Sequence, residues 1–182
     1  MKRYIALLRA INVGGRTVSN ERLRELFETM SLAKVETFIA SGNVIFETNA
    51  RSVAALEKKI ADQLEAGLGF EVGVFVRSDA ELHAIAEHPA FDKAAVAASG
   101  AYCVGMLGAP LSVEQQKALA RMKTDIDDFH VHGREVYWLC KKKQSESTFS
   151  NAAFERALKS RTTFRGFNTI ARLNAKYPLA KA

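Results

Sequence analysis

The amino-acid sequence predicts an α+β protein made of two ferredoxin-like subdomains, a duplicated α/β plait in which each half is a split β-α-β arrangement. Strand-like and helical segments follow the order β-α-β-β-α-β over residues 4–77. Most of this order recurs in the second half, although no letter-level identity supports a repeat. Apolar residues make up 48% and charged residues 25% of the 182 residues, which is typical of a globular protein. The expected domains are residues 1–86 and 100–182, joined by a linker at 87–99.

The first half contains four strand-like runs and two amphipathic helices. The strands are predicted at 4–11, 34–40, 43–48 and 71–77, which are apolar, β-branched or aromatic. Apolar residues at helical spacing mark the helices: Leu23, Leu26, Phe27 and Met30 in the first, and Val53, Leu56, Ile60 and Leu64 in the second. Ser19 is a suitable N-cap for the first helix. The stretch 41–43 predicts a hairpin turn between the second and third strands.

A linking helix and a second set of elements follow. A Ser78/Glu81 capping box predicts the linking helix, which ends before Pro89. Strands are predicted at 101–108, 126–132 and 134–140, and helices after Ser112, around Phe154 and near 168–176. The last helix takes the place of the final strand of the pattern, so the second subdomain is expected to end in a helix.

Hydropathy and cysteine content exclude some classes of protein. No apolar run approaches the roughly 20 residues that a membrane-spanning helix needs. The basic and apolar N-terminus lacks a signal-peptide cleavage site, so we expect a cytoplasmic protein with no membrane partner. Cys103 and Cys140 lie in strand-like segments, and buried reduced thiols are expected there rather than a disulfide or a reactive thiol.

Basic residues are concentrated in the last quarter of the chain. Residues 1–133 carry 15 Lys and Arg against 17 Asp and Glu, whereas residues 134–182 carry 11 against 3. The net charge of +6 therefore comes from the last quarter, which indicates an anionic partner and says nothing about the fold.

Three sequence segments resemble a known family. They are ALLRAINVGG at 6–15, TFIASGNVIF at 37–46, and TFRGFNTI at 163–170. They resemble the uncharacterised bacterial family named domain of unknown function 1697 (DUF1697), in which the third segment tends to read T-x-R-N-W-N-T-V. Gly166 and Phe167 depart from the Asn and Trp of that pattern. The resemblance covers essentially the whole chain and implies a duplicated ferredoxin-like architecture and a bacterial cytosolic protein, without implying an activity.

The stretch RAINVGGRTVSN, residues 9–20, lies between the first strand and the first helix. In ferredoxin-like topology the end of the first strand and the turn after the second strand lie at the same edge of the sheet. We therefore expect a small anion site there, beside the positive end of the helix. Its expected residues are Asn12, Gly14, Gly15, Arg16, Ser41, Gly42 and Asn43. The alternative is ordinary turn chemistry, since glycines in such loops often only let the chain turn.

Arg9 is unusual because it lies within the apolar strand predicted at 4–11, and a buried guanidinium needs a partner. It either extends along the open face of the sheet, pairs with Glu36 or Glu47, or contacts a ligand on that face.

Four residues of the basic last quarter are further candidate contacts to an anion: Lys141, Arg165, Asn168 and Thr169. Basic residues interleaved with Phe164 and Phe167 also suit binding of single-stranded nucleic acid, whereas a solvated loop is the simpler interpretation of a lysine run. His130 and His132 point to one face of a strand, but no further cluster accompanies them and no metal site is predicted.

The sequence favours a non-catalytic or weakly catalytic module that binds a phosphorylated, nucleotide-like or otherwise anionic small molecule. An enzyme that uses the same loop as a phosphate or oxyanion cradle, with Ser41 or Arg9 in the chemistry, is the alternative. No cofactor is predicted, because neither the dinucleotide-binding glycine motif nor the P-loop is present, and the serine-nucleophile motif is absent too. The oligomeric state stays open.

Overall fold

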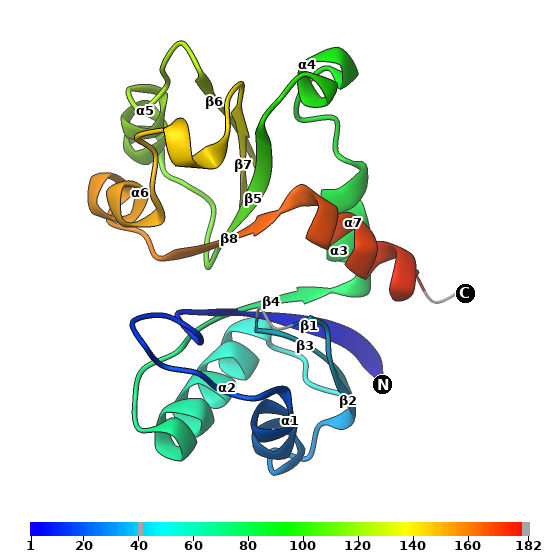
Figure 1. Ribbon diagram of the computed structural model, residues 1–182. Helices are drawn as coiled ribbons and strands as arrows, with labels where there is room; N and C mark the ends of the chain where they lie inside the picture. The colour runs from blue at the N-terminus through cyan, green and yellow to red at the C-terminus, as the bar shows by residue number, and fades with distance from the viewer. Residues whose placement is uncertain (40–41, 180–182) are drawn as a thin grey trace. The chain divides into compact units, whose positions relative to one another are not determined.

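The computed structural model describes residues 1–39 and 42–179. The described residues form two four-stranded antiparallel sheets, each covered by two helices on one face (Figure 1). This architecture confirms the predicted pair of ferredoxin-like α+β subdomains.

The first sheet has the strand order β2-β3-β1-β4, with every neighbouring pair antiparallel. Its elements are β1 (Lys2–Arg9), α1 (Asn20–Glu28), β2 (Ala33–Thr37), β3 (Asn43–Thr48), α2 (Val53–Leu68) and β4 (Gly73–Ser78). The two central strands, β1 and β3, are antiparallel neighbours. The end of β1 at residue 9 and the start of β3 at residue 43 therefore lie at the same edge of the sheet.

Alternate residues of β1 build the core under the helices of the first sheet. Tyr4, Ala6 and Leu8 point to the face that α1 and α2 cover. Phe27 of α1 packs on Phe46 of β3, with 5.7 Å between ring centroids.

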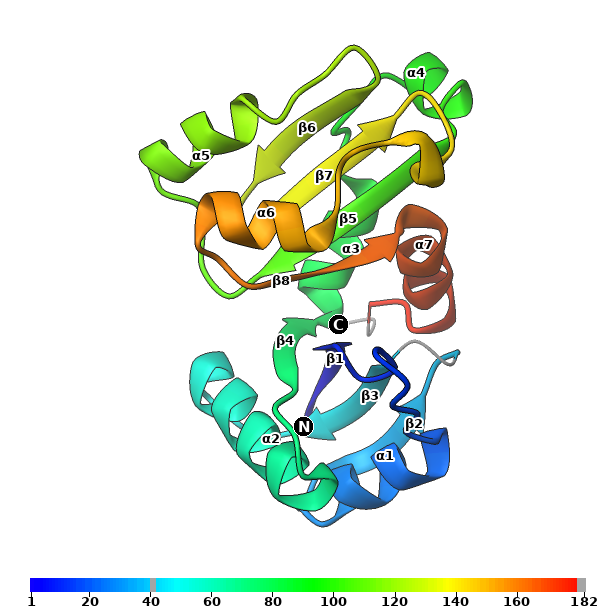
Figure 2. The same cartoon turned by 60° about the vertical axis from the view of Figure 1, so that its left-hand side comes forward.

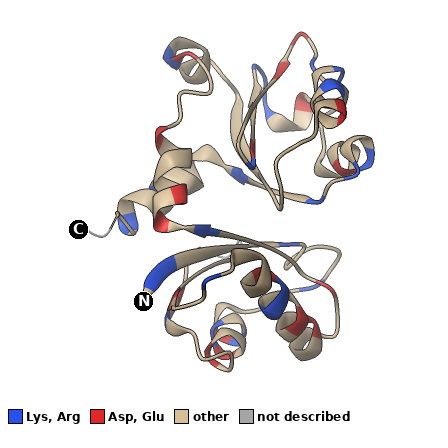
Figure 3. Cartoon of the chain, turned by 180° about the vertical axis from the view of Figure 1, so that it is seen from behind, with Lys and Arg blue, Asp and Glu red and all other residues tan. Residues whose placement is uncertain are grey.

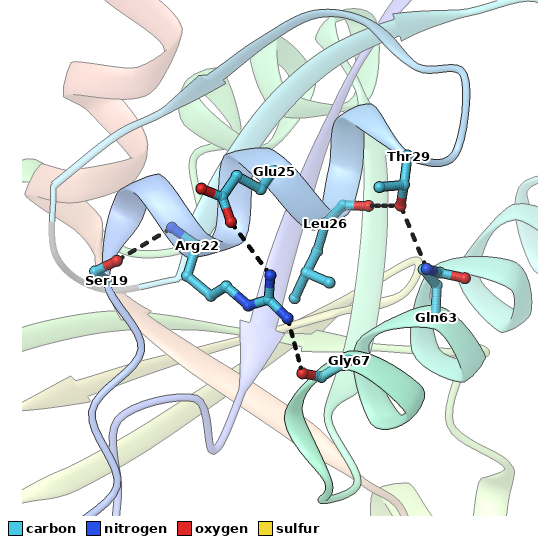
Figure 4. Close-up of polar contacts among 7 residues, drawn as sticks. All are labelled: Ser19, Arg22, Glu25, Leu26, Thr29, Gln63 and Gly67. Carbon is cyan, nitrogen blue, oxygen red and sulfur yellow. Dashed lines mark hydrogen bonds and ion pairs between the residues drawn. The ribbon is translucent and has the colours of Figure 1, made fainter.

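Helix α1 begins where the sequence predicts it to begin. The Ser19 hydroxyl accepts a hydrogen bond from the Arg22 amide, at 3.1 Å (Figure 4). The Arg22 guanidinium then donates to the Gly67 carbonyl at 3.2 Å, and Gln63 donates to the Thr29 hydroxyl at 3.3 Å. These contacts fix α1 against α2 and so fix the loop that precedes α1.

Strand β2 is short and irregular. The β2–β3 register shifts between Ala33 and Glu36, where Lys34 has a φ of 50°. The strand ends at Thr37, three residues before the predicted end at residue 40, and the Phe38 amide donates to the Asn43 carbonyl at 3.0 Å. The connection to β3 is therefore longer than a two-residue hairpin turn.

The second sheet repeats the topology, with the strand order β6-β7-β5-β8 (Figure 2). Two helices precede it, α3 (Asp79–Glu87) and α4 (Lys93–Ala97). Its elements are β5 (Ala101–Leu107), α5 (Val113–Ala120), β6 (Asp127–His132), β7 (Glu135–Cys140), a short 3-10 helix (Gln144–Glu146), α6 (Asn151–Leu158), β8 (Thr162–Gly166) and α7 (Phe167–Lys176).

The expectation that a helix replaces the last strand is wrong, because β8 completes the second sheet before α7 begins. Strand β8 pairs with β5 from the Leu107–Thr162 pair to the Cys103–Gly166 pair. Thr162 is buried and its hydroxyl donates to the Met106 carbonyl at 2.9 Å. The predicted terminal helix is present in addition to the strand.

The chain divides into two compact units, one of residues 1–84 with the chain from Leu173 onward, and one of Ile85–Arg172. In the first unit, the Tyr177 hydroxyl donates to a Glu36 carboxylate oxygen at 2.8 Å, and Arg3 donates to the Pro178 carbonyl. The expected limits of independent domains, at residues 86 and 100, stay a prediction. Among the described residues, no helix combines the length and apolarity that crossing a bilayer requires.

Candidate functional site

The end of β1 and the start of β3 meet at one edge of the first sheet, as the topology requires. We call this edge, made of residues 9–19, 39 and 42–43, the N-terminal rim. The Leu8 amide donates to the Gly42 carbonyl at 2.8 Å. A Cβ added to Gly42 would lie 2.7 Å from Cγ2 of Ile11. The hairpin backbone therefore lies directly against the segment that leads into the glycine loop.

The backbone of the N-terminal rim is the most irregular in the described chain. Ten described residues have a positive φ, and five of them belong to the rim: Ala10, Gly14, Gly15, Ile39 and Gly42. Ile39, at a φ of 51°, is a β-branched residue in a conformation that such residues rarely adopt. Ala10 and Ile39, the two that are not glycine, each cost roughly 1–3 kcal/mol, and strained residues of this kind cluster at ligand sites.

The two asparagines of the rim hold its backbone in place. The Asn12 side-chain oxygen accepts from the Val18 amide at 2.9 Å, which closes the glycine loop. Asn43 is only 1% exposed, and its side-chain amide donates to the Phe38 carbonyl at 3.2 Å. Both side chains thus shape the loops on which a ligand would bind.

The arginines of the rim pack on neighbours that the sequence did not reveal. The Arg16 guanidinium carbon lies 4.5 Å from the centroid of the Phe70 ring, and this contact holds an exposed cation in place. Arg9 is half-buried opposite Gly73 of β4, and a Cβ at Gly73 would lie 3.0 Å from that of Arg9. Because Gly73 has no side chain, the aliphatic part of Arg9 can lie against its backbone.

The carboxylates expected to pair with Arg9 have other partners. Glu47 forms an ion pair with Lys34 at 3.0 Å. Glu36 binds Lys176 at 3.3 Å and Tyr177 at 2.8 Å, and the Tyr177 hydrogen bond is the main cause that lowers the pKa of Glu36. Ser41, the remaining expected residue of the rim, lies outside the described residues.

The candidate anion contacts of the last quarter belong to the second unit. Lys141 is exposed just after β7, and its amide donates to the Ile126 carbonyl at 2.8 Å. Arg165 in β8 donates to the Thr163 hydroxyl at 2.7 Å and to the Phe164 carbonyl at 3.0 Å, and burial lowers its pKa to about 10. Asn168 is exposed and Thr169 half-buried in the first turn of α7.

The aromatic residues interleaved with these cations are packed against other rings. Phe164 contacts Phe149 and Phe154 edge-on, at 5.4 and 5.6 Å. Phe167 stacks on Tyr102 at 4.4 Å. Lys and Arg, like Asp and Glu, occur on both units (Figure 3). The basic residues are therefore not confined to one unit of the protein.

A histidine cluster lies on the face of the second sheet opposite α5 and α6. The Nε2 atoms of His88 and His130 are 2.8 Å apart, and the rings of His88 and His132 stack at 4.0 Å. Burial, and the charges of His132 and His130, lower the pKa of His88. Among the residues that the structure describes, no group of His, Cys, Asp or Glu has an arrangement that could hold a metal ion. Cys103 and Cys140 are buried free thiols, and burial raises the pKa of Cys103 to about 11.

These features define a protein of two ferredoxin-like α+β units with irregular backbone gathered at one sheet edge. The chain belongs to the family described as "Protein of unknown function (DUF1697)", whose model matches residues 1–137. The segment 163–170 lies beyond that match. The fold is similar to that of a conserved bacterial protein from Streptococcus pneumoniae, with a TM-score of 0.70 and 25% identity over 94% of this chain and 98% of that chain. No curated protein matches the sequence.

Proposed function

We propose that this protein is a binding module for a small anionic ligand, phosphorylated or nucleotide-like, which binds at the N-terminal rim. The observation that carries the proposal is the gathering of five positive-φ residues at this edge, next to the start of α1. Three of the five are glycines, which adopt this conformation freely, but Ala10 and Ile39 are strained there. Strained backbone is retained where the surroundings require it, and ligand sites are the common case. The positive end of a helix dipole favours an anion at the same place.

The local charge supports an anion as the ligand. Residues 9–19 contain two arginines and no Asp or Glu. Arg16 is exposed and held over Phe70, so little side-chain entropy is lost when its guanidinium binds an oxyanion. Gly14 and Gly15 are exposed, and a Cβ at either position would have no atom within 4 Å, so a ligand can approach their backbone.

Calorimetric titration of the whole chain with inorganic phosphate and with nucleoside monophosphates, at low salt, tests the proposal. Arg16→Ala is expected to weaken binding by about tenfold, the effect of one charge-assisted hydrogen bond. Arg51→Ala is the matched control, because Arg51 is also exposed but follows β3 at the end of the strand away from the rim. No binding of any of these anions, or an equal loss in both variants, would contradict the proposal.

The same titration separates this function from the alternatives. An enzyme that uses the rim as a phosphate cradle would convert the ligand, and phosphorus NMR of the titrated sample would show a product. A nucleic-acid binder would retain oligonucleotide affinity in Arg16→Ala and lose it as salt is raised.

A further inference from the structure

A cavity of about 650 Å³ lies in the second unit, and none of the residues that line it belongs to the N-terminal rim. Three segments line it: the chain from Pro89 to Ala98, which includes α4; the turn from Lys123 to Asp128; and Leu139 with Lys141 at the end of β7. Its volume falls within the roughly 300–1,000 Å³ of small-molecule sites.

Hydrogen bonds hold the walls of this cavity in place. The Thr124 hydroxyl donates to Asp127 at 2.9 Å and accepts from the Asp127 amide at 3.0 Å, which fixes the turn at 123–128. The Gly100 amide donates to the Cys140 carbonyl at 2.9 Å, so the segment after α4 is anchored to β7. Phe91 packs edge-on against Tyr102 at 5.9 Å. The cavity is therefore formed before any ligand binds.

The lining combines apolar side chains with charges of both signs. Phe91, Ile126 and Leu139 are half-buried or buried and supply apolar surface. Lys123 and Asp128 neutralise each other in an ion pair at 2.8 Å. Asp127 also lines the cavity, but its carboxylate accepts hydrogen bonds from Trp138, Ser147 and Thr124.

Four other charged side chains of the lining, two cations and two anions, take part in none of these contacts and can bind a ligand. They are Lys93, Lys141, Asp92 and Asp125, all exposed to solvent. Two Lys against two Asp give the remaining lining no net charge. A purely anionic or purely cationic ligand would meet one repelling pair of these groups, whereas a ligand that carries both charges meets a partner for each.

We propose that this cavity binds a zwitterionic small molecule with an apolar body, the chemistry of a hydrophobic α-amino acid. The lysine ammonium groups bind the carboxylate of the ligand, and the aspartates bind its ammonium group. The side chains of Phe91, Ile126 and Leu139 contact its apolar part. The proposal does not depend on the anion site at the rim, which lies in the other unit.

Calorimetric titration of the full chain with L-phenylalanine and L-leucine tests this assignment. N-acetyl-L-phenylalanine, which keeps only the carboxylate, and phenethylamine, which keeps only the ammonium group, are the matched probes. We expect each to bind at least about tenfold more weakly than the amino acid, because each loses one charged contact. If neither amino acid binds, or if a singly charged probe binds as well as L-phenylalanine, the proposal is wrong.

Variants locate the binding in the cavity. Ala95→Trp places a large ring in the cavity from an exposed position of α4 and is expected to abolish binding. Ala94→Trp is the control, because Ala94 is exposed on the same helix but does not line the cavity. Lys141→Ala and Asp125→Ala should each weaken binding by about tenfold without a change in the melting temperature. Equal affinity in wild type and Ala95→Trp, with the fold verified by NMR, would overturn the assignment.

Discussion

Gly42 is the residue on which the geometry of the N-terminal rim depends most. It has a φ of 69°, and an added Cβ would lie 2.7 Å from Ile11 and 3.2 Å from Leu8. Gly42→Ala therefore adds backbone strain to a steric clash, and we expect it to lower the free energy of unfolding by about 2–4 kcal/mol. Urea denaturation followed by circular dichroism measures the effect.

Gly14→Ala is the matched control for that substitution. Gly14 has a similar φ of 65°, but nothing lies within 4 Å of its added Cβ. Only the strain remains, at about 1 kcal/mol. Equal losses in both variants would show that the contact between the hairpin and Ile11 does not matter.

Asp127 is the polar centre of the second unit. Burial alone would raise its pKa, but hydrogen bonds from Ser147, Trp138 and Thr124 lower it, and the net direction is downward from the ordinary value. Asp127→Ala leaves those donors unpaired, so we expect a loss of about 2–3 kcal/mol. Trp138 is the one tryptophan of the sequence, and its fluorescence reports the unfolding of this unit.

The pH dependence of the same variant gives a second readout. Because the pKa of Asp127 is lowered on folding, its contribution to stability is present above the ordinary pKa of an aspartate and is lost as the pH falls through the folded value. The wild-type protein should therefore lose more stability on acidification than Asp127→Ala. A variant as acid-sensitive as the wild type would contradict this account.

The positions of the rim residues could be predicted from the sequence, but the contacts of their side chains could not. The positions of Gly42 and Asn43 follow from topology alone. Asn12 and Asn43 were expected to be available to a ligand, but a short amide side chain in a loop satisfies the nearest unpaired backbone group first. The contact between Arg16 and Phe70 could not be predicted, because it joins segments far apart in sequence.

Among the strands, β8 is the one that was not predicted from the sequence. It is a five-residue strand that pairs only with β5, and its Thr162-Thr163 start and Gly166 end resemble a loop. Its burial comes from tertiary pairing and not from a local alternation of apolar residues. The other strands and the long helices carry local patterns, and these were predicted correctly apart from their ends.

The end of α7 is held by a hydrogen bond that can be tested separately. Tyr177→Phe removes the donor to Glu36, so the pKa of Glu36 should rise toward its ordinary value. Stability above that ordinary pKa should fall by roughly 0.5–1 kcal/mol, because Glu36 is partly exposed. NMR titration of the Glu36 carboxyl carbon measures the shift.

Lys176→Ala is the comparison for Tyr177→Phe. Lys176 and Glu36 are both about half exposed, at 50% and 53%, so the loss of this ion pair should matter less than the loss of the hydroxyl. A larger pKa change in Lys176→Ala would reverse the assigned order of causes.

At the scale of the whole molecule, the charge distribution predicts a weak and non-specific affinity for polyanions. The excess of 11 basic over 3 acidic residues after position 133 attracts phosphates. Arg165 is half-buried, and Phe164 and Phe167 pack on other rings, so base stacking is not expected to add to this affinity. Binding of single-stranded RNA, measured by fluorescence anisotropy, should fall at least tenfold between roughly 50 and 200 mM salt. Salt-resistant or sequence-specific binding would contradict this expectation.

The presence of two similar subdomains could be predicted, because the order of the elements and the handedness of their connections allow few topologies. The grouping of the chain from Leu173 onward with the first unit was not predictable, because contacts such as that of Tyr177 with Glu36 join residues more than a hundred positions apart. Local patterns determine which elements form, whereas contacts such as that of Tyr177 with Glu36 depend on the assembled fold.

The irregular β2 has a consequence for how copies of this protein meet. As an outer strand of its sheet, it would offer unpaired amide and carbonyl groups to any extended chain. The register shift between Ala33 and Glu36 bends that border, and Lys34 places an exposed cation on it. A strand of a second molecule therefore cannot form a regular ladder of hydrogen bonds with β2. Fibril-like growth from this sheet would first require the register shift in β2 to be removed.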